Sequence, residues 1–225
     1  MQVLNEPFDS APRLLARSAR VFLGNLPFLA TITLAVFIPG KLLFQFIGYM
    51  LDIPPDGIAS YLLMDFSDLV LGSLAGAAAI YGLATRKGVA ASLRRGRRLW
   101  ARMFWTRIKV EVTIALWMLL LFVPGIVATV KLALTESVVV LEDREPEPLE
   151  RSKQLTQGRR WRVFFVIAPL MLLDLAGSIG VLSALPDVAH SRWLLAVADS
   201  LLAIISMWTT VAGLLMYLGI TRSEE

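Results

Sequence analysis

The stretch WLLAVADSLLAIISMWTTVAGLLMYLGI occupies residues 193–220 and carries one charged side chain, Asp199. A helix needs about 20 predominantly apolar residues to cross the hydrocarbon core of a bilayer, so this stretch is long enough. Comparable apolar stretches occur at residues 27–50, 58–84, 104–123, 125–142 and 162–184. The sequence therefore predicts an all-α fold, a polytopic membrane bundle of six transmembrane helices within one domain, residues 1–225.

The composition excludes several classes of protein. Apolar residues make up 56% of the 225 residues, and the mean hydropathy is +0.66, which exceeds the share in typical soluble domains. No cysteine and one histidine are present, so disulfides, thiolate chemistry and multi-histidine metal sites are excluded. The net charge of +4 is compatible with nucleic-acid binding, but no nucleic-acid-binding motif accompanies it. We expect no cofactor, no metal and no nucleic-acid partner.

Basic residues mark alternate connections between the apolar stretches. Beyond the stretches, one side holds Arg192, and the opposite side holds Arg13, Arg17, Arg20, Arg86, Lys87, Arg94, Arg95, Arg97, Arg98, Arg102, Arg144, Arg151, Lys153, Arg159, Arg160, Arg162 and Arg222, with Arg107 and Lys109 just inside the third stretch. Lysine and arginine accumulate in cytoplasmic loops. The pattern predicts a multi-pass protein of the cell (plasma or inner) membrane, with residues 1–26 and 221–225 in the cytoplasm.

Three basic amphipathic segments precede the odd-numbered spans: APRLLARSAR (residues 11–20), SLRRGRRLWAR (92–102) and LERSKQLTQGRRWR (149–162). Arginine reaches phosphates, tryptophan favours the membrane interface, and each charge near an anionic surface contributes about 1 kcal/mol. The candidates for contact with anionic headgroups are Arg97, Arg98, Arg102, Arg159, Arg160 and Arg162. The alternative is that these arginines only set the topology.

Residues 123–164, VPGIVATVKLALTESVVVLEDREPEPLERSKQLTQGRRWRVF, carry a family-like pattern: Pro124-Gly125, Lys131, Glu142, Leu149, Ser152, Leu155, Gly158, and the return at Arg159 to Arg162. The segment resembles the membrane domain attached to some glycerophosphoryl diester phosphodiesterases and related stand-alone six-helix bacterial membrane proteins of unknown function. The resemblance implies a membrane protein linked to lipid metabolism. It brings no catalytic site, because the family's His-Arg-Gly motif belongs to a separate soluble domain. Pro148-Leu149 departs from the family pattern and leaves the start of that helix open.

Ionisable residues inside apolar spans are the default candidates for function in a membrane protein. Counted at about 1.5 Å per residue, the candidates fall in one slab between the middle of the bilayer and its outer leaflet. This slab contains six carboxylates and only two lysines. The full cluster is Lys41, Asp65, Asp68, Glu111, Lys131, Glu136, Asp174 and Asp199.

Two interpretations of this polar cluster remain open. In the first, Lys41, Asp65, Lys131 and Asp174 line a water-filled cavity that responds to protons or cations. In the second, the cluster is structural: Lys41 pairs with Asp65 or Asp68, and protonated acids bond to nearby hydroxyls, those of Ser67, Ser73, Thr135, Ser178 and Ser200. Gly72-x-x-x-Gly76 also permits close helix packing, within the chain or in a dimer.

Enzyme motifs are missing from the sequence. It contains no His-Glu-x-x-His zinc motif and no Gly-x-Ser-x-Gly elbow, and a serine–histidine pair would depend on His190. We therefore predict a non-enzymatic integral membrane protein that handles or senses a lipid, small solute or cation through its polar cluster. The alternative is an accessory membrane module that binds anionic lipid or a partner protein at its basic cytoplasmic face.

Overall fold

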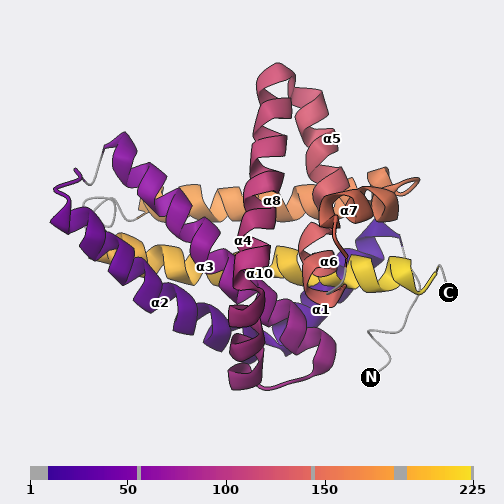
Figure 1. The fold of residues 1–225 in the computed structure, drawn as a ribbon, viewed down its shortest axis with the longest axis horizontal. Coiled ribbons are helices and arrows are strands. Elements are labelled where there is room, and N and C mark those ends of the chain that lie inside the picture. The colour runs from indigo at the N-terminus through magenta and orange to yellow at the C-terminus, as the bar shows by residue number, and fades with distance from the viewer. Residues whose placement is uncertain (1–9, 55–56, 143–144, 185–191, 224–225) are drawn as a thin grey trace.

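A computed structural model describes residues 10–54, 57–142, 145–184 and 192–223, and within these ranges every regular element is a helix (Figure 1). His190 lies outside the described residues. The helices are α1 (Ala11–Gly24), α2 (Leu26–Met50), α3 (Ile58–Thr85), α4 (Val89–Leu120), α5 (Phe122–Leu132), α6 (Thr135–Leu141), α7 (Pro148–Thr156), α8 (Arg160–Ala184) and α10 (Arg192–Thr221).

Five segments are long and apolar enough to cross a membrane: Leu26–Met50, Ile58–Thr85, Val123–Leu141, Arg160–Gly180 and Trp193–Thr221. They correspond to five of the six predicted spans. The remaining stretch, residues 104–123, falls mostly in α4, which is continuous with the basic segment before it. Because this half of α4 also contains Arg107, Lys109 and Glu111, it is too charged to qualify by hydropathy. The six-span topology and the side on which the termini lie stay predictions.

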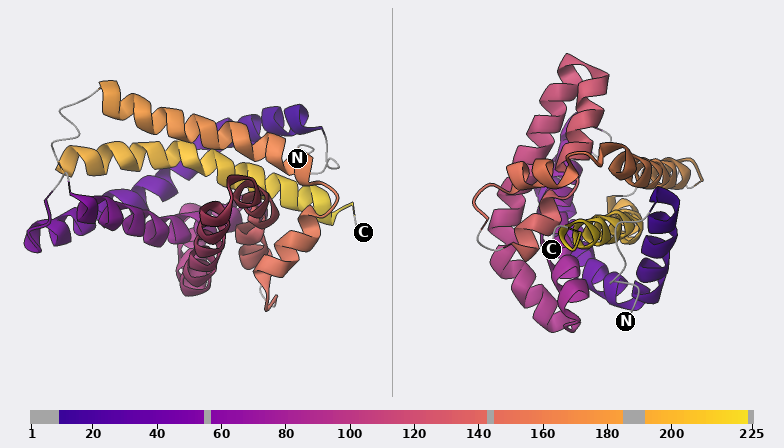
Figure 2. Two further views of the ribbon diagram at one scale, coloured as in Figure 1. Left: turned by 90° about the horizontal axis from the view of Figure 1, so that it is seen from above. Right: turned by 90° about the vertical axis from the view of Figure 1, so that its right-hand side faces the viewer.

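The apolar helices do not all run in the same direction. Helices α8 and α10 follow the long axis of the molecule, with α2 and α3 packed near one end (Figure 1). The α4–α5 hairpin crosses this direction and projects from the body, as the view along the long axis shows (Figure 2). Large apolar side chains near its tip are widely exposed, Leu119 by 85% and Leu121 by 67%. Such a surface suits an apolar solvent rather than water.

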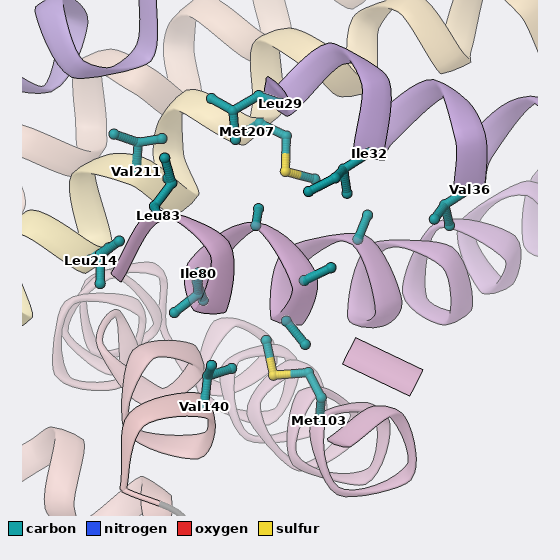
Figure 3. Packing of buried hydrophobic residues seen from close by; sticks show 14 of the residues in the cluster. Leu29, Ile32, Val36, Ile80, Leu83, Met103, Val140, Met207, Val211 and Leu214 are labelled. Atoms are coloured by element: carbon teal, nitrogen blue, oxygen red, sulfur yellow. The ribbon is translucent and has the colours of Figure 1, made fainter. Parts of the chain in front are cut away.

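The main hydrophobic cluster surrounds α3. Small residues on this helix, Ala75 and Ala77 to Ala79, are fully buried and let neighbouring helices approach closely. Leu29 and Ile32 of α2 pack over this face (Figure 3). Contacts also come from Met103 of α4, Val140 of α6 and Met207, Val211 and Leu214 of α10. Helix α3 is therefore the centre on which the candidate site is built.

The fourth predicted span is interrupted between α5 and α6. The Ser152 hydroxyl of α7 donates a hydrogen bond to the Lys131 carbonyl at 2.9 Å and accepts one from the Leu134 N–H at 3.2 Å. One side chain thus satisfies both a carbonyl and an amide that the break leaves outside the helical ladder. Helix α7 begins at Pro148, where a proline needs no N–H partner, and this settles the start that the sequence left open.

Candidate functional site

A cavity of about 790 Å³ lies between α2, α3, α8 and α10, with one wall from α4. Four aspartates line or border it: Asp65, Asp68, Asp174 and Asp199. We call it the aspartate cavity. Its volume falls within the range of about 300–1,000 Å³ typical of small-ligand sites. Apolar side chains such as Phe37 and Met207 complete the wall.

Lys41 is the most deeply buried charge of the site, with 1% of its side chain exposed. Its Nζ atom lies 2.8 Å from Asp68 Oδ1 and also forms an ion pair with Asp199. A buried ammonium group is costly unless carboxylates surround it, and here α3 and α10 each supply one. The sequence left Asp65 and Asp68 open as partners for Lys41. The structure selects Asp68 and adds Asp199.

Close contact between α2 and α3 brings Lys41 to its partners. A Cβ atom at Gly40 would lie 2.3 Å from a methyl carbon of Leu71, so a larger residue at this position would displace the Leu71 side chain of α3. The other two aspartates are held differently. Asp174 accepts a hydrogen bond of 2.5 Å from the Ser206 hydroxyl, whereas Asp65 is exposed at the cavity wall.

A second cavity of about 410 Å³ adjoins the first, between α4, α6, α8 and α10. Glu111 and Glu136 line it, together with many hydroxyl side chains: Thr106, Thr129, Thr135, Ser137, Ser206, Thr209 and Thr210. We call it the hydroxyl cavity. Four residues line both cavities, namely Arg107, Asp174, Ser206 and Thr210. The two spaces therefore meet at a polar junction.

Arg107 occupies this junction. Its Nη2 and Nε atoms lie 2.6 Å and 2.7 Å from Glu136 Oε1. Among the described residues that line either cavity, it is the one basic side chain. The sequence places Arg107 with the topology-setting charges, although its position inside an apolar stretch, four residues before Glu111, could have marked it as a site residue.

The Gly72-x-x-x-Gly76 pair makes room for this ion pair. A Cβ atom at Gly72 would lie 2.4 Å from Arg107 Nη1, and one at Gly76 would lie 3.5 Å from Arg107 Nη2 and 3.6 Å from Glu136 Oε2. The glycines thus accommodate side chains of α4 and α6. The packing use of this motif is intramolecular, and it serves the site directly.

Lys131 does not join the cluster. It lines a third cavity of about 360 Å³ between α4, α5 and α7. Depth counted along a straight span placed Lys131 level with the aspartates, but the α4–α5 hairpin runs across the other apolar helices (Figure 1). The predicted slab is therefore divided: seven of its eight residues surround the two joined cavities, and Lys131 lies elsewhere.

The hydroxyls proposed as partners for protonated acids are used differently. Each donates to a backbone carbonyl of its own helix or of the preceding turn, at 2.6–3.0 Å, as found for Ser67, Ser73, Thr135, Ser178 and Ser200. A hydroxyl has one hydrogen to donate. These five groups therefore do not donate to the acids of the cluster, although their oxygens can still accept a hydrogen bond from a protonated acid. The Lys41–Asp68 ion pair is one that the structural interpretation named.

Four of the six candidate lipid-facing arginines are exposed: Arg97, Arg98, Arg160 and Arg162. The other two are half-buried and hydrogen-bonded within the protein. Arg102 Nη2 donates to the carbonyls of Glu142 and Glu145 at 3.3 Å and 2.5 Å, and Arg159 Nη2 donates to Ser223 Oγ at 3.1 Å.

Glu142, at the end of α6, holds three helices together. Its carboxylate accepts a hydrogen bond from the Tyr217 hydroxyl at 2.8 Å and forms an ion pair with Arg151 at 3.2 Å. Helices α6, α7 and α10 are therefore tied to one acidic side chain. This gives Glu142 of the family-like segment a structural role.

No protein-family model, curated protein or solved structure matches the chain. The resemblance to the phosphodiesterase-associated membrane domain accordingly stays a prediction.

Proposed function

We propose that this chain is an integral membrane protein that binds and handles a small cation through the joined aspartate and hydroxyl cavities, in the manner of a transporter. We place it in the cell membrane with both termini in the cytoplasm, on the distribution of arginines. The observation that carries the proposal is the excess of acid. Six carboxylates surround the two cavities, and Lys41 and Arg107 are the basic partners among the described residues.

The ion pairs of Lys41 and Arg107 leave three of the six acids without a basic partner among the described residues. Lys41 takes Asp68 and Asp199, and Arg107 takes Glu136. Among the described side chains, no base forms an ion pair with Asp65, Asp174 or Glu111. A carboxylate in an apolar environment is costly unless a cation or proton accompanies it. These three acids line a continuous polar route through the cavities and supply the binding groups.

Arg107 controls passage between the two cavities. A fixed positive charge in a narrow polar route is a barrier to cations, and its ion pair with Glu136 holds it at the junction. A cation that enters the aspartate cavity passes further only when the guanidinium moves aside. The pair therefore acts as a gate, and Asp174 is the acid that lines both cavities.

Reconstitution in liposomes tests this function. Uptake of radiolabelled rubidium and of methylammonium is measured for the full chain and for Asp174→Asn, which removes the charge and keeps the shape. We expect uptake to fall by about tenfold, corresponding to a loss of about 1.4 kcal/mol of binding. Asp52→Asn is the matched control, because Asp52 is exposed at the end of α2 and has a positive φ that asparagine also tolerates. Equal uptake by all three proteins would refute cation handling.

A second candidate function rests on a different observation, the exposed arginines beside Trp161. Arg160 and Arg162 are exposed beside Trp161, which is 75% exposed, and this combination suits a membrane interface rich in anionic lipid. An accessory role at the basic cytoplasmic face, with anionic lipid or a partner protein, follows from it. Replacing both arginines by glutamate should abolish such an accessory role while leaving rubidium uptake intact. Unchanged binding to anionic lipid and to partner protein by this variant would refute the accessory role.

A further inference from the structure

The third cavity differs in chemistry from the other two. Lys131 of α5 and Lys153 of α7 are its charged lining residues in the part of the chain that the structure describes, and no described carboxylate lines it. Its volume is about 360 Å³. Helix α7 lies at the foot of the α4–α5 hairpin, where this cavity is formed (Figure 1). The cavity therefore presents positive charge where the aspartate cavity presents negative charge.

The two ammonium groups are available to an anion. Lys131 forms no ion pair with any described residue. Lys153 pairs with Glu150 at 2.6 Å, but 39% and 54% of these side chains are exposed, and such a surface pair contributes little stability. The Thr113 hydroxyl in the wall already donates to the Lys109 carbonyl at 2.6 Å. The lysines are thus the charged donors left to bind a ligand.

The rest of the wall is apolar. Val123, Val127 and Ala128 of α5 and Trp117 of α4 line the cavity. Leucines at the tip of the same hairpin are widely exposed, Leu119 by 85% and Leu120 by 69%. A soluble anion would satisfy the lysines but leave these apolar walls uncovered. A ligand with an anionic head and a hydrocarbon chain would satisfy both parts.

We propose that this cavity binds an anionic phospholipid, with the phosphate on Lys131 and Lys153 and an acyl chain along Trp117 and the apolar face of α5. The site is separate from the cation route, and it does not depend on the function proposed above. It also differs from the exposed arginines of the cytoplasmic face, because its lysines lie in a cavity with an apolar wall.

Native mass spectrometry of the full chain in detergent tests the site. The number of phosphatidylglycerol molecules retained is compared for the protein and for Lys131→Gln/Lys153→Gln. Two charges of about 1 kcal/mol each correspond to a loss of about thirtyfold in affinity. The matched control is Lys87→Gln/Arg94→Gln, which removes two exposed positive charges outside the cavity and should change affinity less than about twofold.

Three results would overturn the lipid site. Retention of phosphatidylglycerol by the double variant overturns it, as does equal binding of phosphatidylcholine, which would show apolar packing alone. Displacement of the lipid by inorganic phosphate at the same free concentration would show a site for a soluble anion. Lys153→Gln alone, at a half-exposed position on α7, guards against a folding defect and should lower affinity about fivefold. Asp174→Asn should leave lipid binding unchanged, which separates this site from the cation route.

Discussion

Gly72→Ala should open the gate between the two cavities without unfolding the protein. The new Cβ would lie 2.4 Å from Arg107 Nη1, whereas unstrained contact needs about 3.5 Å. The tip of a flexible arginine absorbs the difference by moving about 1 Å. Since Arg107 lies 2.6 Å from Glu136, a shift of that size breaks the hydrogen-bonded pair. The substitution itself favours the helix by about 1 kcal/mol.

The expected size of the effect follows from the pair that is lost. Hydrogen bonds between charged groups contribute about 1.5–3 kcal/mol, so the open form should gain about tenfold or more in population. Rubidium leak through liposomes carrying the variant should rise by a similar factor, while the thermal midpoint measured by circular dichroism stays equal or rises.

Gly76→Ala provides the control for this prediction. A Cβ atom there meets the same ion pair at ordinary contact distances, 3.5 Å from Arg107 and 3.6 Å from Glu136. Both variants replace a buried glycine of α3 one helical turn apart, and only one displaces the guanidinium. If the two variants leak equally, or if neither leaks more than the unmodified protein, Arg107 is not the barrier between the cavities.

Three further predictions concern stability in detergent. Lys41→Met should cost about 1–3 kcal/mol, because it leaves two partly exposed carboxylates, Asp68 and Asp199, without their cation. Adding Asp68→Asn and Asp199→Asn should recover most of the loss in a thermal unfolding series, and no recovery would contradict the ion-pair account. Arg102→Gln should lower stability by about 1.5–3 kcal/mol and increase hydrogen exchange at the end of α6; unchanged exchange there would argue against this role. Ser152→Ala should cost about 1–3 kcal/mol by leaving a buried N–H unpaired, whereas Ser152→Thr keeps the hydroxyl and should cost less; equal losses would contradict it.

Sequence reasoning located the acids of the site, and it identified one partner, Lys41, with Asp68 as one of two alternatives. The helical nature of the chain and most apolar helices follow from periodicity and length. Depth along a span also brought Lys41 level with Asp68, because both lie on neighbouring antiparallel helices joined by a short connection. Asp199 was missed as a partner since depth alone does not state which face of a distant helix turns inward.

Two other residues, Lys131 and Arg107, were assigned wrongly because positions were counted along each span alone. Lys131 was grouped with the aspartates on the assumption that every apolar stretch runs parallel to the others, and the crossing of the α4–α5 hairpin removes that assumption (Figure 2). Arg107 was counted as a topology-setting charge. Its position four residues before Glu111 could have marked it as a site residue, but the space that two glycines of α3 leave for its ion pair is not visible in the sequence of α4.

The two hydrogen bonds of the Ser152 hydroxyl link the position of α7 to that of α6. Because the Ser152 hydroxyl bonds both the Lys131 carbonyl in the last turn of α5 and the Leu134 N–H just before α6, a displacement of α7 would also displace the start of α6, which carries Thr135 and Glu136.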